Sequence, residues 1–239
     1  MAIKLSLVAG GGTIAPSGPA EVCAPAQGIL RLPVPPRPTL SELFATSPRD
    51  GGWAGFLLPR IDRAKPLLWV QERMAILESG RIYPPGLPCA GIIHVEARDA
   101  RAALWAMEEG LRCTALSAVI GELWGDPAAL DFTATRRLAV AAERFGVAAF
   151  LIRLGGHANL SGARMRWRIA SAPSLPNPLD RQAPGAPVWD AELFRARGAA
   201  PGRWMVAHEG DQEAGTPDPV GLAAGSGDRA LGEAERRRA

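Results

Sequence analysis

The stretch AVIGELWGDPAALDFTATRRLAVAAERFGVAAFLIR, residues 118–153, combines the patterns of a strand, a helix and a second strand. Its two ends are short runs of mostly apolar residues, which is typical of strands buried on both faces of a sheet. Between them, Asp131 or Thr133 can cap a helix whose apolar residues share one face, and Gly146 stands where a left-handed stop is expected. The stretch therefore predicts a βαβ unit of a parallel sheet.

The same alternation extends toward the N-terminus. Residues 67–71 and 91–96 are further apolar runs, and residues 99–111 have helical spacing with Asp99 as a candidate cap. After residue 153 the pattern changes to strands without helices, at residues 163–172, 187–197 and 202–209. We therefore predict an α/β fold in three layers, with a mostly parallel central sheet that ends in an antiparallel strand meander.

Both ends of the chain differ from this middle part. Residues 1–45 are rich in Pro, Gly and Ala and show no sustained periodicity, so we predict a flexible N-terminal segment with polyproline character in places. Residues 209–239 carry seven acidic residues against four arginines and are predicted to form a flexible C-terminal tail. The folded domain is accordingly expected at residues 46–208.

The composition of the 239 residues is that of a globular protein, because 47% are hydrophobic and no apolar run reaches the roughly 20 residues of a membrane-spanning helix. The net charge is +3; the C-terminal tail contributes −3, which leaves +6 on residues 1–208. Nearly all basic residues are arginines, which suits contact with phosphate groups. Three scattered cysteines fit reduced thiols in the cytoplasm and predict no metal site.

A glycine-rich turn precedes the first of the apolar runs, at residues 46–60 with the sequence TSPRDGGWAGFLLPR. Gly51, Gly52 and Gly55 could let the backbone approach phosphate groups closely, as in a phosphate loop. The Lys and the Ser or Thr that such a loop needs are missing, since Ala54 and residues 56–58 stand in their place. We therefore predict a degenerate nucleotide site that binds neither ATP nor magnesium.

Two carboxylates complete the candidate nucleotide site. Glu72 follows an apolar run, at an expected strand end from which a Glu could orient attacking water, and Glu122 lies near the expected position of a magnesium-binding acid. The alternative for Glu72 is a solvated Glu at a helix start, and the alternative for Glu122 is a structural carboxylate. His94 lies inside an apolar run and is expected to be a packed core histidine, and no nucleophile has a base near it in sequence. The sequence thus predicts a protein without catalytic activity.

The order of these elements resembles a RecA-like core, and the chain is most similar to the ImuA family. The runs that carry the resemblance lie within residues 65–208, most specifically RWRIASAPS and the GEL…TATRRLAVAAE stretch. The resemblance implies an accessory protein of SOS-induced, error-prone translesion DNA synthesis in response to DNA damage. It also implies two partners, a Y-family-like polymerase protein and an error-prone C-family polymerase, with RecA as a further candidate. A SulA-like cell-division inhibitor and an active ATP-dependent recombinase are the alternatives.

In RecA-like folds, DNA lies against loops that leave the C-terminal edges of the central strands. The corresponding loops here are residues 124–131 and 154–163. We expect single-stranded DNA to contact side chains in and around the second loop, whose guanidinium groups would meet phosphates: Arg153, His157, Asn159, Arg164, Arg166 and Arg168. Alternation along residues 163–172 places Trp167 on the opposite side from Arg164, Arg166 and Arg168. Trp167 could either lie in the core or stack on bases, and both readings stay open.

A protein partner is the stronger expectation. The chain has seven tryptophans against one tyrosine, and spacing does not assign all of them to the core. Exposed Trp and Arg commonly anchor protein interfaces. The candidate anchors are Trp53, Trp124, Trp189 and Trp204.

Overall fold

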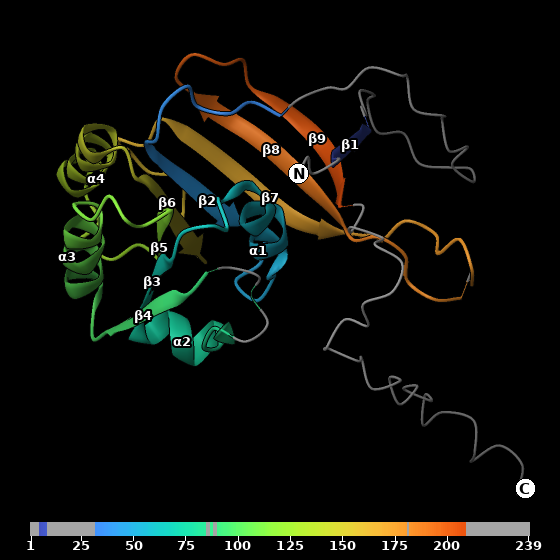
Figure 1. Ribbon diagram of the computed structural model, residues 1–239, viewed down its shortest axis with the longest axis horizontal. Helices are drawn as coiled ribbons and strands as arrows, with labels where there is room; N and C mark the ends of the chain where they lie inside the picture. The colour runs from blue at the N-terminus through green and yellow to red at the C-terminus, as the bar shows by residue number, and fades with distance from the viewer. Residues whose placement is uncertain (1–4, 9–31, 85–86, 88–89, 181, 209–239) are drawn as a thin grey trace, which may run out of the picture.

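A single sheet of nine strands runs through the computed structural model, which describes residues 5–8, 32–84, 87, 90–180 and 182–208 (Figure 1). The strands are β1 (Leu5–Val8), β2 (Leu40–Ala45), β3 (Leu67–Glu72), β4 (Ile92–Ala97), β5 (Ala118–Trp124), β6 (Ala148–Leu154), β7 (Met165–Ala172), β8 (Val188–Ala196) and β9 (Gly202–His208). The helices are α1 (Gly52–Leu57), the 3-10 turn η1 (Leu58–Arg60), α2 (Arg73–Ser79), α3 (Ala100–Gly110) and α4 (Phe132–Phe145).

The strand order across the sheet is β1-β9-β8-β7-β2-β6-β5-β3-β4. From β7 to β4 each neighbouring pair is parallel, whereas β7, β8, β9 and β1 pair antiparallel. This confirms the predicted α/β fold with a mostly parallel sheet and an antiparallel end. Each strand expected from its apolar pattern is present, and its ends lie within about two residues of the expected ones.

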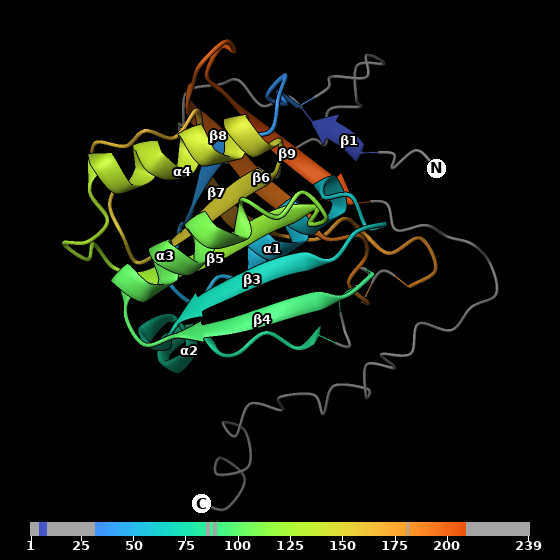
Figure 2. The same ribbon diagram turned by 60° about the vertical axis from the view of Figure 1, so that its left-hand side comes forward.

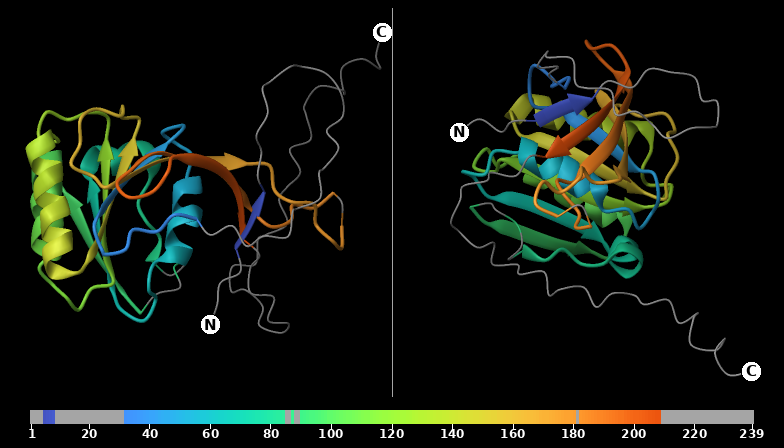
Figure 3. Two further views of the ribbon diagram at one scale, coloured as in Figure 1. Left: turned by 90° about the horizontal axis from the view of Figure 1, so that it is seen from above. Right: turned by 90° about the vertical axis from the view of Figure 1, so that its right-hand side faces the viewer.

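Helices cover both faces of the parallel half, which gives three layers. Helices α3 and α4 lie side by side on one face, and α1 and α2 lie on the other (Figures 2 and 3). One core therefore forms around Leu138, Met107 and Leu151, and a second around Trp53, Phe56 and Trp69 on the opposite face. Apolar strands with side chains on both faces supply both cores.

Helix α4 shows why residues 118–153 fold as predicted. The carboxylate of Asp131 accepts a hydrogen bond from the backbone N–H of Ala134 at 2.7 Å, and this caps the first turn. Leu138, Ala139 and Ala142 are buried on the face toward the sheet. Gly146 ends the helix with φ of 70°, a left-handed conformation that glycine adopts without strain.

The expected start of the folded domain at residue 46 is wrong, because β2 lies at the centre of the sheet, between β6 and β7. This strand and β1, which pairs with β9, both fall in the segment expected to be flexible. Ser41 and Glu42 interrupt the apolar pattern of β2, yet both are buried. The remaining residues before Leu32, and the tail at residues 209–239, lie outside the described residues.

Strand β7 confirms the predicted alternation on one side only. Met165, Trp167 and Ile169 are buried against α1 and β8, which rules out the stacking role considered for Trp167. On the other side, Arg168 is exposed as expected, but Arg166 is almost fully buried.

Candidate functional site

The turn that the sequence singled out follows β2 and leads into α1, which is the strand–loop–helix arrangement of a phosphate loop. Helix α1 begins at Gly52 and has the sequence GWAGFL, so it contains no Lys, Ser or Thr. Trp53 is buried in the core, 6.0 Å from the ring of Trp69.

The carboxylate of Asp50 occupies the space in front of this helix start. Oδ1 accepts a hydrogen bond from the backbone N–H of Gly52 at 2.8 Å, and Oδ2 accepts one from the backbone N–H of Ser171 at 2.7 Å. The hydroxyl of Ser171 also donates to Oδ1. Burial acts to raise the pKa of Asp50, but the hydrogen bonds from Ser171 and Gly52 outweigh it, and the pKa is lowered. We call this set of contacts the Asp50–Ser171 latch.

The latch leaves no room for a side chain on Gly52. A Cβ atom on Gly52 would lie 2.6 Å from Oγ of Ser171 and 3.0 Å from Oδ1 of Asp50. A Cβ on Gly55 would lie 2.4 Å from the ring of Trp189. These two glycines therefore serve close packing of α1 against β7 and β8, whereas a Cβ on Gly51 would meet nothing within 4 Å.

Glu72 ends β3 and is buried, which differs from the solvated position considered for it. Its Oε2 accepts a hydrogen bond from the backbone N–H of Trp124, at the end of β5, at 2.9 Å. The carboxylate thus joins the ends of two neighbouring strands.

Glu122 is also buried, in the middle of a polar network on the α1–α2 face of the sheet. Its Oε1 accepts hydrogen bonds from Nε1 of Trp69 at 2.5 Å and from Nε2 of Gln71 at 3.1 Å. Burial raises the pKa of Glu122 to about 7, although both hydrogen bonds oppose the change. The carboxyl group therefore holds its proton over much of the range below neutral pH.

His94 extends this network from the edge strand β4. Its Nε2 lies 3.0 Å from Oε1 of Gln71. Burial and the nearby charge of Arg81 lower its pKa. The side chain is only half-buried, so the expectation of a packed core histidine is wrong. Across the described ranges, no three His, Cys, Asp or Glu side chains are grouped so that they could hold a metal ion.

The second candidate site, at the loop that follows β6, is built differently from the expected arginine patch. Arg153 is completely buried, where it forms ion pairs with Asp126 and, at 3.8 Å, with Glu42. Arg166 is buried beside it and donates to Oε2 of Glu42 at 2.7 Å. Burial lowers the pKa of Arg153, and the two carboxylates oppose this. Neither guanidinium group reaches the surface, so the prediction that these two arginines meet phosphates is wrong in this conformation.

The other four residues predicted to contact DNA are accessible to different degrees. His157 is exposed. Its backbone N–H donates to Oδ1 of Asp126 at 2.9 Å, and its Nδ1 lies 2.7 Å from Oδ2 of the same carboxylate. Asn159 lies next to Arg153, whose Nη1 is 3.4 Å from its Oδ1. Arg164 and Arg168 are partly exposed and are paired with Glu143 at 2.6 Å and Glu192 at 3.0 Å.

Sequence reasoning missed the acidic partners that organise both sites. Asp50 lies one residue before the N-cap Gly51, and an Asp in a glycine-rich turn commonly accepts a hydrogen bond from the backbone N–H two residues on, so this signal was available. Glu42 and Asp126 gave no such signal, because their partners come from strands and loops distant in sequence.

The four tryptophans considered as interface anchors are not the exposed ones. Trp53 and Trp189 are buried, and Trp124 and Trp204 are partly buried. The exposed tryptophan is Trp105 on α3, with 64% of its surface accessible.

None of the helices in the described ranges is both long enough and apolar enough to span a bilayer.

No protein-family model matches the chain. Two curated relatives do, one from each of two strains of Caulobacter vibrioides and both named Protein ImuA. Each is 37% identical over 183 residues, and the alignment covers 72% of this chain and 71% of the relative.

Proposed function

The chain belongs to the ImuA family, and we propose that it is a non-enzymatic, RecA-like accessory protein of SOS-induced, error-prone translesion DNA synthesis. In this role it joins polymerase components in the cytoplasm during the response to DNA damage. Its partners are a Y-family-like polymerase protein and an error-prone C-family polymerase, with RecA as a further candidate.

The observation that carries the non-enzymatic part of the proposal is the Asp50–Ser171 latch. In a working phosphate loop, successive backbone N–H groups bind phosphate oxygens, a Lys reaches the terminal phosphates, and a hydroxyl holds magnesium. Here the N–H of Gly52 already donates to a carboxylate of the same chain. A negative carboxylate in front of the helix start would repel a phosphate group, and no Lys side chain offsets that repulsion.

The contacts of the two other carboxylates of the candidate nucleotide site, Glu72 and Glu122, support the same proposal. The Oε2 of Glu72 accepts from the backbone N–H of Trp124, which gives this carboxylate a structural contact between two strands. The Oε1 of Glu122 accepts hydrogen bonds from Trp69 and Gln71 inside the buried network. Their contacts fit structural carboxylates, the alternative that the sequence left open for Glu122.

The test has two independent measurements on the full-length protein. Isothermal titration with ATP and magnesium should give no heat of binding, and a coupled assay should detect no ATP turnover. Magnesium-dependent turnover that Glu72→Gln abolishes would instead support the active recombinase. In a second measurement, the purified Y-family-like protein of the same cassette should bind the chain, whereas binding to the tubulin-like division protein would favour the SulA-like alternative.

A further inference from the structure

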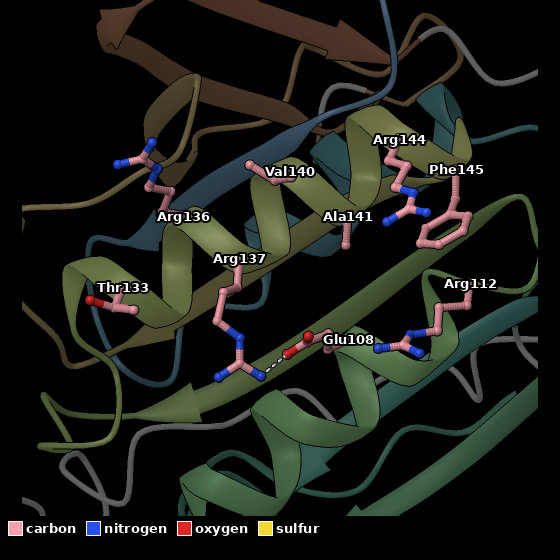
Figure 4. A pocket seen from close by; sticks show the side chains of 9 residues that line it. All are labelled: Glu108, Arg112, Thr133, Arg136, Arg137, Val140, Ala141, Arg144 and Phe145. Atoms are coloured by element: carbon pink, nitrogen blue, oxygen red, sulfur yellow. Dashed lines mark hydrogen bonds and ion pairs between the residues drawn. The ribbon is translucent and has the colours of Figure 1, made fainter.

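Helices α3 and α4 leave an open groove between them on the surface that faces away from the sheet (Figure 4). The groove has a volume of about 420 Å³. Nine residues line it: Glu108, Arg112, Thr133, Arg136, Arg137, Val140, Ala141, Arg144 and Phe145. It lies on the opposite face of the sheet from the Asp50–Ser171 latch, and its residues play no part in the two sites described above.

The groove is strongly basic. Four arginines against one glutamate give its lining a net charge of +3. Arg137 is paired with Glu108, and Arg112 lies 3.6 Å from Glu109. Within the described part of the chain, Arg136 and Arg144 have no carboxylate partner. Two guanidinium groups of the groove are therefore free to pair with acidic groups from another molecule.

Apolar surface lies between these two arginines. Val140 is four residues from each of them on α4, and 49% of its surface is exposed. Ala141 and Phe145 are partly exposed beside it. Because β-branched residues are poor helix formers, an exposed Val in the middle of α4 adds nothing to the stability of the free helix. Arginines that surround an exposed apolar centre are typical of protein-binding surfaces.

We propose that the α3–α4 groove binds an acidic, amphipathic helix of the Y-family-like partner protein. This inference rests on the adaptor function proposed above. Arg136 and Arg144 are eight residues apart, which is about 12 Å along the axis of α4. A partner helix that lies along α4 would meet both arginines with carboxylates about two turns apart. An apolar residue midway between those carboxylates would cover Val140.

The alternative ligand, single-stranded DNA, fits the groove less well. Phosphates could pair with the arginines, but bases need an open aromatic face on which to stack. Phe145 is the aromatic residue of the lining, and the guanidinium of Arg144 already lies over its ring at 5.3 Å from the centroid. The apolar centre at Val140 likewise has no counterpart in a sugar–phosphate backbone.

The experiment measures binding of the purified Y-family-like protein of the same cassette to immobilised full-length chain by biolayer interferometry. The double variant Arg136→Glu/Arg144→Glu should weaken binding at least tenfold, and Val140→Ser several-fold. The matched control Arg63→Glu/Arg195→Glu makes the same change in net charge at exposed positions outside the groove, and it should keep the affinity within twofold. Circular dichroism melting curves establish that each variant is folded.

The outcomes separate this inference from the function on which it rests. If the partner binds wild type and the groove variants equally well, the inference is overturned and the adaptor function stands. If the partner does not bind wild type, the adaptor function fails and the inference fails with it. If the double variant loses affinity for a fluorescent oligonucleotide but not for the partner protein, the groove binds single-stranded DNA and the proposal is overturned. If deletion of residues 209–239 strengthens partner binding only where the groove is intact, the acidic tail is the occupant, which also overturns the proposal.

Discussion

The carboxylate of Asp50 joins the loop before α1 to Ser171 in β7, a residue 121 positions further along the chain. It does so with three hydrogen bonds, two of them from backbone N–H groups. A charged acceptor that satisfies several donors stabilises both the helix start and the strand against which it packs.

Replacing Asp50 should therefore lower the stability of the whole domain. We expect Asp50→Ala to reduce the free energy of unfolding by about 1–2 kcal/mol, because it leaves the N–H of Gly52 and both donors of Ser171 without this acceptor. Asp50→Asn should cost less, since it keeps one acceptor oxygen. Urea denaturation measures the change. The control Glu78→Ala, at an exposed site on α2, should stay within about 0.5 kcal/mol of wild type; an equal loss there would remove the special role of Asp50.

The buried ion pairs of Arg153 and Arg166 with Glu42 predict a much larger effect. Arg153→Ala leaves Glu42 with one ion-pair partner fewer in the core, and such losses cost about 3–5 kcal/mol. Arg168→Ala, on the same strand face but in a half-exposed pair with Glu192, should cost at most about 1 kcal/mol. Urea denaturation of both variants tests this contrast. Similar losses of unfolding free energy for the two variants would show that the buried ion pairs of Glu42 contribute no more than a surface pair.

The raised pKa of Glu122 predicts a pH dependence with a definite sign. Between the unfolded pKa of about 4.3 and the folded pKa of about 7, the folded protein binds the proton and the unfolded chain does not. Stability from this group is therefore fully present below about pH 4 and falls as the pH rises toward 7. The total loss is on the order of 4 kcal/mol.

Glu122→Gln provides the comparison, because the amide cannot titrate and keeps an acceptor oxygen for Trp69. Other carboxylates with lowered pKa values, such as Asp50 and Asp126, change stability in the opposite direction, so the difference between wild type and variant is the quantity to measure. The variant should gain stability relative to wild type as the pH rises from 4.5 to 8 in urea titrations. A constant difference would contradict the raised pKa.

The accessible residues around the loop after β6 predict weak, salt-dependent binding of single-stranded DNA. Arg164→Ala/Arg168→Ala should lower the affinity several-fold in fluorescence anisotropy and reduce the salt slope by about 1.4, that is, about 0.7 for each phosphate contact. Arg101→Ala, at an exposed position on α3, serves as the control. Equal affinity and equal salt slope for the double variant and wild type would remove this loop from any DNA-binding role.

The sequence predicted those parts of the fold whose signals are local. Asp131 caps α4 and Gly146 ends it, as the spacing indicated, and the apolar runs of β3, β5 and β6 needed no distant partner to be recognised. Strand β2 could not be found in this way, because Glu42 breaks its apolar pattern. The residues that make Glu42 acceptable in the core are Arg153 and Arg166, which are contributed by β6 and β7.

The same limit applies to the candidate sites. Alternation correctly placed Arg166 on the side of β7 opposite Trp167, but it could not show that Glu42 and Phe44 of a neighbouring strand cover that side. The absence of a Lys from the glycine-rich residues 46–60 was visible in the sequence. The contacts of Asp50 with Ser171 were not visible in the sequence, because the two residues lie far apart along the chain and meet only in the folded protein.

The central position of β2 has a consequence for how the protein is made. Leu40 pairs with Ala149 and Ser41 with Met165, so this strand leaves the ribosome more than 100 residues before its neighbours. Until then its two hydrogen-bonding edges are open to other nascent chains, and the two halves of the sheet cannot join. Synthesis that stops anywhere between β2 and β7 therefore yields a fragment that exposes β2 and is a substrate for chaperones or proteases.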